Sequence, residues 1–232
     1  LKYNDEFKNP TLNSNEFKYP FISLNNRSHL HRCVFIDEMA KENLIDKGIV
    51  TWVKHLNENN SYPYNYFDNR QILLNDDFVT KLDSFLIPKE YNQSLFHVIT
   101  EATHKVNFIT EKTIIPMLLK KPFFVLSNHH YSKHLKDLGF ELYDEIIDYS
   151  FDDWKGLHDR TKHFVNNIHK LLTLNLSETY NKLLPKIEHN YNRAIEISKD
   201  HTLVPDLIKE RVQRLIISVL SLHPYLLNSK PS

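Results

Sequence analysis

The central part of the chain carries FITEKT at residues 108–113 and KPFFVL at residues 121–126. The first stretch places an acid–base pair, Glu111 and Lys112, at an expected helix start, and the second is an expected buried strand. A glutamate there can accept hydrogen bonds from ribose hydroxyls, and a lysine beside the positive end of a helix can neutralise phosphate oxygens. The junction therefore predicts a site for a sugar–phosphate group. Solvated charges at a helix start are the commoner alternative.

Strands and helices alternate outward from this junction. Buried apolar runs predict four strands, at residues 21–24, 49–53, 95–100 and 123–126. Helical patterns begin near residues 30, 111 and 130, and Gly48 and Gly139 are expected to end the first and the last of them. The alternation predicts an α/β fold with a Rossmann-like parallel sheet flanked by helices.

The pattern divides the chain into three expected parts. Residues 1–20 are polar and rich in asparagine, which predicts a linker or the remnant of a preceding domain. Residues 21–150 form the expected Rossmann-like domain. Residues 151–232 show only helical periods, which predicts a C-terminal helical extension.

Composition excludes several classes of protein. Lys and Arg together number 29, as do Asp and Glu, so the formal net charge is zero and a nonspecific polyanion binder is not expected. The single cysteine, Cys33, excludes an internal disulfide and a cysteine-based zinc site. Three glycines are too few for a glycine-rich phosphate loop. No apolar run approaches about 20 residues, so no membrane span is expected, and the absence of a signal-peptide pattern suggests a cytoplasmic protein.

Charged residues follow two of the expected strands directly. Arg27, His31 and Arg32 come after the first strand, and Glu101 comes after the third. Ligands of doubly wound sheets bind at the carboxyl ends of the strands, so these side chains are expected to share a crevice with Glu111 and Lys112. The planar guanidinium of Arg32 suits a diphosphate. The alternatives are surface arginines and a glutamate that caps a helix.

Metal binding is not expected from the histidines and paired aspartates. His130 and His134 are four residues apart but lack the carboxylate of a zinc-protease motif. The pairs Asp76–Asp77 and Asp152–Asp153 lack Asp-x-Asp spacing and are expected to lie at caps or turns.

The order of these features resembles the C-terminal half of fucosyltransferase-like glycosyltransferases of the GT-B type. The resemblance covers roughly residues 20–160 and rests mainly on the Thr-Glu-Lys helix start. The matching segments are SLNN at 23–26 with Arg32, FHVITE at 96–101, FITEK at 108–112, KPFFV at 121–125, and LKDLGF at 135–140 with Asp148.

The resemblance implies a fold, an activity and a set of roles. Arg32 and Lys112, with Arg27 beside them, would bind the diphosphate of a nucleoside-diphosphate sugar. Glu111 would accept from the ribose hydroxyls, and Glu101 would lie near the donor sugar as the catalytic residue. Such enzymes transfer the sugar without a bound metal or other cofactor, because Arg and Lys stabilise the leaving diphosphate.

The resemblance leaves the acceptor unknown. The acceptor domain of these enzymes precedes the matching half, so it is expected to be missing here, removed, or supplied by a partner chain. The alternative is a noncatalytic nucleotide-binding or assembly module with the same fold. An enzyme that glycosylates nucleic acid is a third hypothesis, which the neutral charge disfavours.

Overall fold

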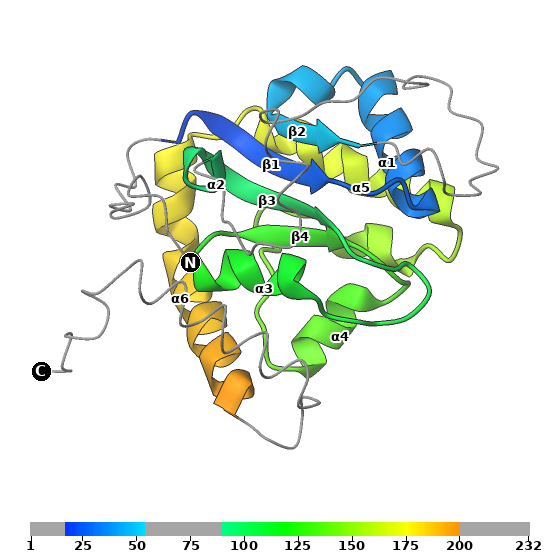
Figure 1. Cartoon of the computed structure of the whole chain (residues 1–232). Coiled ribbons are helices and arrows are strands. Elements are labelled where there is room, and N and C mark those ends of the chain that lie inside the picture. Colours follow the sequence, from blue (N-terminus) through cyan, green and yellow to red (C-terminus); the bar gives the residue numbers. More distant parts are fainter. Residues whose placement is uncertain (1–16, 54–89, 200–232) are drawn as a thin grey trace, which may run out of the picture.

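The computed structural model describes residues 17–53 and 90–199. Its centre is a sheet of four parallel strands in the order β2-β1-β3-β4 (Figure 1). The strands are β1 (Tyr19–Asn25), β2 (Ile49–Trp52), β3 (Ser94–Thr100) and β4 (Phe123–Leu126). The helices are α1 (Leu30–Lys41), α2 (Glu90–Gln93), α3 (Glu111–Leu118), α4 (Tyr131–Asp137), α5 (Leu157–Leu171) and α6 (Leu176–Lys199). Short 3₁₀ helices η2 (Ile45–Lys47) and η3 (Tyr149–Asp153) complete the elements. This arrangement confirms the expected α/β fold with a parallel sheet flanked by helices.

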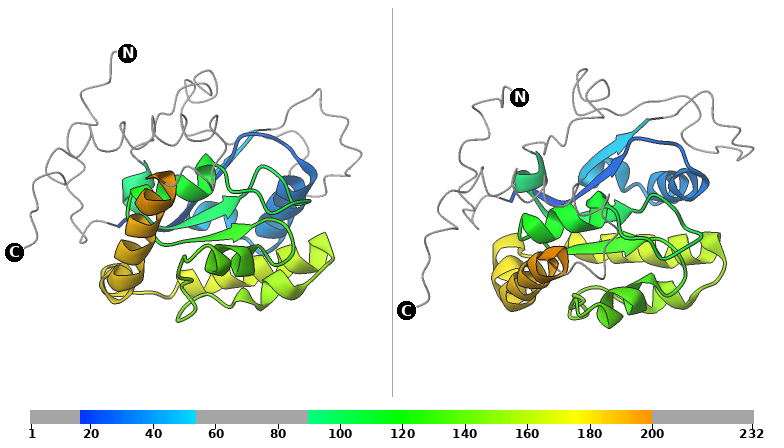
Figure 2. Two further views of the ribbon diagram at one scale, coloured as in Figure 1. Left: turned by 90° about the horizontal axis from the view of Figure 1, so that it is seen from below. Right: turned by 60° about the horizontal axis from the view of Figure 1, so that its bottom comes forward.

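The strands form where the sequence predicts them because both faces of the sheet are covered. All seven residues of the central strand β3 are buried, and so are all four residues of β4 at the edge of the sheet, because helices cover both faces. β4 matches its expected limits, and β1 and β3 begin one or two residues earlier than expected. Figure 2 shows α3 and α5 on opposite sides of the sheet. The molecule is therefore built in three layers, with the sheet in the middle.

Aromatic rings fill the layer between the sheet and α5. Phe164 of α5 lies 4.7 Å from Phe124 of β4 and 5.9 Å from Phe35 of α1, measured between ring centroids. Phe164 also meets Phe151 of η3 edge to face at 5.0 Å. Burial of rings of this size supplies much of the hydrophobic stabilisation of the fold. The expected helical extension therefore contributes α5 to the same core as the sheet, and residue 150 does not mark a break in that core. The helical pattern at 207–220 lies outside the described residues.

Three of the helices, α1, α3 and α4, end in the same way. Each has a residue in the left-handed region after its last turn, and the next amide donates to a carbonyl five residues back, which is the Schellman arrangement. The left-handed residues are Asn43 (φ 55°), Lys120 (φ 53°) and Gly139 (φ 86°). The matching hydrogen bonds are Leu44 N to Met39 O, Lys121 N to Pro116 O and Phe140 N to Leu135 O. The expected role of Gly139 is confirmed.

The expected role of Gly48 is wrong. Helix α1 ends at Lys41, and Asn43 terminates it, whereas Gly48 has an extended backbone with φ −146°. A Cβ atom on Gly48 would lie 2.7 Å from the Phe21 ring and from the Phe21 carbonyl oxygen. Gly48 is thus required by the close approach of β1 and not by a helix cap.

None of the described helices is both long and apolar enough to cross a membrane.

Candidate functional site

The strand order reverses between β1 and β3, and this reversal defines the candidate site. After β1 the chain crosses one face of the sheet in α1, and after β3 it crosses the other face in α3. The two connections therefore separate at the carboxyl ends of β1 and β3, which is where open α/β sheets bind ligands. Five charged residues are expected to gather at this edge: Arg27, Arg32, Glu101, Glu111 and Lys112.

A buried set of polar side chains joins the three strands at this edge. Asn25 ends β1; its Oδ1 accepts from Thr100 Oγ1 of β3 at 2.7 Å, and its backbone amide donates to Thr51 Oγ1 of β2 at 3.0 Å. Asn25 and Thr51 are fully buried. Unpaired polar groups at such positions would be costly, so these hydrogen bonds hold the strand ends in register. The sequence signal for these bridging hydrogen bonds is the asparagine that ends β1, although the sequence alone did not predict that Asn25 joins the strands.

Arg32 is buried and binds main-chain carbonyls. Its side chain is directed from α1 toward the end of β3, where Nη2 donates to the carbonyls of Thr100 at 3.2 Å and Glu101 at 3.1 Å. Its Nη1 donates to the carbonyl of Arg27 at 3.4 Å. Arg32 is only 3% exposed, so its donors face the protein interior. The structure therefore places Arg32 as a clamp between the β1–α1 turn and the end of β3, beneath the surface that a diphosphate would meet.

Glu101 is fully buried, and its carboxylate is surrounded by donors. Its two oxygens accept from the amides of Ala102 and Thr110 and from the hydroxyls of Thr110, Thr113 and Tyr131, at 2.6–3.5 Å. Burial and the Glu101 carboxylate raise the pKa of Tyr131 well above its ordinary value, so that hydroxyl stays a donor at neutral pH.

The surroundings of Glu101 match the helix-capping alternative. Thr110 is the N-cap of α3, and its hydroxyl donates to Glu101 while accepting from the amide of Lys112 at 3.3 Å. In this structure the Glu101 carboxylate is not placed to contact a donor sugar, because it is 0% exposed and fully occupied. Its effect is to fix the start of α3, and through it the directions of Glu111 and Lys112.

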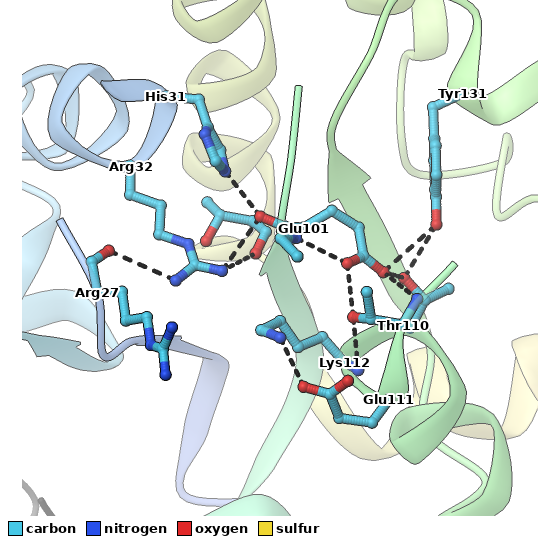
Figure 3. A network of polar contacts seen from close by, with 11 residues as sticks. Arg27, His31, Arg32, Glu101, Thr110, Glu111, Lys112 and Tyr131 are labelled. Atoms are coloured by element: carbon cyan, nitrogen blue, oxygen red, sulfur yellow. Dashed lines mark hydrogen bonds and ion pairs between the residues drawn. The ribbon is translucent and has the colours of Figure 1, made fainter. Parts of the chain in front are cut away.

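Glu111 and Lys112 lie on the outside of this buried layer. Lys112 Nζ is 2.6 Å from Glu111 Oε1, and the two side chains are 31% and 47% exposed respectively. Figure 3 shows this pair below Glu101 and the Arg32–Arg27 contact to the left of it. Arg27 is exposed. The five expected residues therefore divide into a buried pair, Arg32 and Glu101, and an outer group, in which Arg27 and Glu111 are exposed and Lys112 is half-buried.

A small cavity opens beside Lys112 on the face of β1 and β3. It measures about 40 Å³, and its lining includes Leu24, Tyr91, Thr100 and Lys112. This volume holds about one water molecule and is far below that of a pocket for a nucleotide.

The described part of the chain contains no group of three or more side chains able to hold a metal ion. His129 and His130 lie at the start of α4 with their rings tilted by 46° and their centroids 3.5 Å apart, and His130 Nδ1 is 3.7 Å from Asp153 Oδ1. Asp152 is buried, and its carboxylate accepts from the amide of Ser132 at 2.6 Å. It thus supports the first turn of α4, as the capping alternative predicts. Asp76 and Asp77 lie outside the described residues.

Two histidines at this edge make contacts that the sequence does not reveal. His31 Nε2 is 2.7 Å from the carbonyl oxygen of Glu101, and His31 Nδ1 is 3.2 Å from Nδ1 of His104. His31 was noted only because it follows β1, and nothing in the loop sequence singles out His104. Their partners lie more than 60 residues away along the chain, which is why spacing alone does not find them.

Comparison with known proteins gave no match: no family model fits the chain, and no curated protein or solved structure is significantly similar to it.

Proposed function

We propose that this chain binds a nucleoside-diphosphate sugar and acts as the donor-binding half of a metal-independent glycosyltransferase of the GT-B type. The observation that carries the proposal is the reversal of strand order between β1 and β3, with the exposed Arg27 in the connection after β1 and the partly exposed Lys112 at the start of α3 after β3. A cation at a helix start beside a sheet edge is suited to phosphate oxygens. The resemblance of the Thr-Glu-Lys segment to that of GT-B glycosyltransferases also favours a nucleoside-diphosphate sugar as the ligand.

Two cations would bind the diphosphate. Lys112 lines the same cavity as Thr100, and the main chain of Arg27 is linked to the end of β3, because Arg32 bridges the carbonyls of Thr100 and Arg27. Arg27 takes the role first expected for Arg32, whose donors are directed inward. Arg32 and Glu101 then hold the two cationic segments in place.

Glu111 would receive the ribose hydroxyls. Its carboxylate is 47% exposed at the first turn of α3, and in the absence of ligand it pairs with Lys112. Phosphate oxygens would compete with Glu111 for the lysine ammonium, so ligand binding would release the carboxylate toward the ribose. The transfer itself would displace the nucleoside diphosphate at the anomeric carbon, and the cations would stabilise the developing charge.

A noncatalytic nucleotide-binding module is the second candidate. The burial of Glu101 favours it, since the carboxylate expected to act on the sugar is not at the surface. In that case the chain would bind nucleotide sugars without turning them over, or would need an acceptor domain from another segment or a partner chain to do so.

Nucleotide binding is the first test. Thermal unfolding is followed with GDP, UDP and ADP at millimolar concentration and with EDTA present, because any ligand of the folded state raises the melting temperature. Arg27→Ala and Lys112→Ala are each expected to lower the affinity for the nucleotide by roughly tenfold or more, because each variant loses a charged hydrogen bond to the ligand. Lys133→Ala removes an exposed lysine of α4 and serves as the matched control.

Absence of a shift with all three nucleotides would contradict the proposed function. Release of the nucleoside diphosphate from the matching nucleotide sugar separates the two candidates. Turnover would support the transferase, and tight binding without turnover would support the noncatalytic module.

A further inference from the structure

Three histidines gather at the carboxyl edge of the sheet, outside the group that would hold the diphosphate. His29 and His31 lie at the start of α1, with parallel rings whose centroids are 6.1 Å apart. His104 lies in the loop after β3, and its ring centroid is 5.1 Å from that of His31. The two segments that separate at the strand-order reversal are therefore joined by imidazole rings.

Hydrogen bonding determines which nitrogen of each ring carries the proton. The Glu101 carbonyl oxygen can only accept, so His31 Nε2, at 2.7 Å from it, must be protonated and donate. In a neutral ring this leaves a lone pair on His31 Nδ1. His104 Nδ1, at 3.2 Å, must then be the donor of the bond between the rings. A neutral His104 consequently carries its lone pair on Nε2.

The surroundings of the two rings keep them neutral. Burial, followed by the charge of Arg32, lowers the pKa of His31 to about 3. Burial and the charges of Arg160 and Lys105 also lower the pKa of His104 from its ordinary value. At neutral pH both rings are therefore uncharged, and the chain of donors from His104 through His31 to the Glu101 carbonyl is intact.

The buried end of this chain is rigid, and its outer end is half-exposed. His31 is 1% exposed and is held at the carbonyl that also accepts from Arg32 Nη2. His104 is half-buried, and among the described residues its only hydrogen bond is the one to His31. The half-buried His104 ring is thus held at the ligand edge by its hydrogen bond to His31, the positioning residue, and its Nε2 lone pair has no partner among the described residues.

The charge around this lone pair determines what it can bind. Arg32, Arg160 and Lys105 act on the two rings, so a metal cation would be repelled. A neutral hydroxyl is a suitable partner, because it can donate to the lone pair and its oxygen can still accept from a cation. Sugars carry such hydroxyls, and the sugar of a nucleotide sugar extends from the diphosphate.

We propose that His104 Nε2 is a sugar subsite, which accepts a hydrogen bond from a hydroxyl of the sugar in the bound nucleotide sugar. The inference rests on the proposed function, since the nucleotide brings the sugar to this edge. It assigns Arg27 and Lys112 to the diphosphate and the histidine pair to the sugar, so the two parts of the ligand depend on different residues.

The test compares each nucleoside diphosphate with its sugar conjugate by isothermal titration of the full chain. The probes are GDP with GDP-mannose and GDP-fucose, UDP with UDP-glucose and UDP-galactose, and ADP with ADP-glucose. His104→Asn keeps an amide donor in the position of Nδ1 but has no atom at Nε2. We expect it to bind the nucleoside diphosphate within twofold of the wild type and the conjugate roughly three- to tenfold more weakly, as loss of one hydrogen bond predicts. His169→Asn, at the end of α5, is the control.

Nuclear magnetic resonance of the wild type provides a second readout that does not depend on a variant folding. Long-range proton–nitrogen spectra should show His104 protonated at Nδ1, with an Nε2 resonance that moves on addition of the sugar conjugate but not of the nucleoside diphosphate alone. A His104 ring protonated at Nε2, or equal losses for both ligands in His104→Asn, would overturn the sugar subsite alone. Failure of every nucleotide to bind would overturn the proposed function and this inference together.

Discussion

Glu101 and Lys121 are buried ionisable residues at opposite edges of the same sheet, and the protein stabilises them in different ways. Glu101 follows β3 at the carboxyl edge, and five donors surround its carboxylate. Lys121 precedes β4 at the amino edge, is 1% exposed, and lies 4.3 Å from the centroid of the Phe17 ring. No ion pair is found for Lys121 within residues 17–53 and 90–199.

The difference shows what burial does to each charge. The Glu101 carboxylate is compensated by hydrogen bonds and fixes the position of α3. For Lys121, an aromatic face compensates only part of the desolvation, and burial lowers its pKa to about 7. The carboxyl edge is therefore held in one geometry, whereas the amino edge carries a group that titrates near neutral pH.

Removal of the Glu101 carboxylate should have the largest effect. Glu101→Ala leaves the donors of Thr110, Thr113 and Tyr131 buried without their acceptor, so we expect a loss of about 3 kcal/mol or more in the free energy of unfolding. Urea denaturation measures it. Glu111→Ala, next to the same N-cap, should cost less than about 1 kcal/mol because its side chain is exposed. Equal losses of stability in the two variants would show that the buried Glu101 carboxylate stabilises the fold no more than the exposed Glu111 carboxylate does.

Lys121→Met should change how stability depends on pH. The lysine pKa is 10.5 ordinarily and about 7 in the folded protein, so between these values the unfolded chain binds more protons and the wild type gains stability as pH rises. The variant lacks that gain and is the more stable protein at pH 7. Its advantage should shrink by about 2 kcal/mol between pH 7 and pH 9.

Urea denaturation across this pH range measures the difference between the two proteins. Lys133→Met replaces an exposed lysine and should keep the slope of the wild type. A constant difference between Lys121→Met and the wild type would mean that the buried amine keeps its proton through this range.

Arg32→Lys should have an intermediate effect at the carboxyl edge. A lysine keeps the charge but cannot reach several carbonyls with a planar fork, so we expect a loss of about 1–2 kcal/mol. Arg27→Lys should leave stability unchanged within about 0.5 kcal/mol, since Arg27 is exposed. The reverse order of losses would mean that Arg27, and not Arg32, joins the two strand ends.

Asn43→Gly should have the smallest effect, at the amino edge. Asn43 occupies the left-handed region at φ 55°, where glycine is less strained, so we expect a gain of up to about 1 kcal/mol. Gly139→Ala is the opposite change in the same motif: its φ is 86°, and the new Cβ would lie 2.9 Å from Arg193 Nε. Thermal unfolding of both variants should give shifts of opposite sign.

Local patterns were sufficient to predict most of the elements. Short apolar runs located the four strands of the described sheet, and the Thr-Glu-Lys segment predicted that α3 begins near Glu111, which is its first residue. The end of α1 was not predicted, because asparagine and glycine can both end a helix and Gly48 was the more conspicuous signal. Gly48 is a glycine because the Phe21 ring of the neighbouring strand leaves no space for a side chain there, and a local sequence pattern cannot show that contact.

The candidate site was predicted as a set of residues but not as an arrangement. At the expected edge Arg27 and Glu111 are exposed and Lys112 is half-buried, while Arg32 and Glu101 are buried beneath it. A charged residue after a strand is predictable from the sequence. Whether its side chain faces solvent or the interior depends on the donors and acceptors that other elements of the fold place around it.

The amino-acid sequence by itself determined the alternation of strands and helices, the parallel sheet and the cap of α3, because these follow from the periodicity of burial and from hydrogen bonds between near neighbours. Only the tertiary structure decided that Arg32 binds carbonyls, that Glu101 is enclosed by donors, and that His31 and His104 form one chain of hydrogen bonds. Each of these contacts joins β3 or its following loop to an element distant in the chain. Their energies depend on distance and direction in space, which are set when the layers pack.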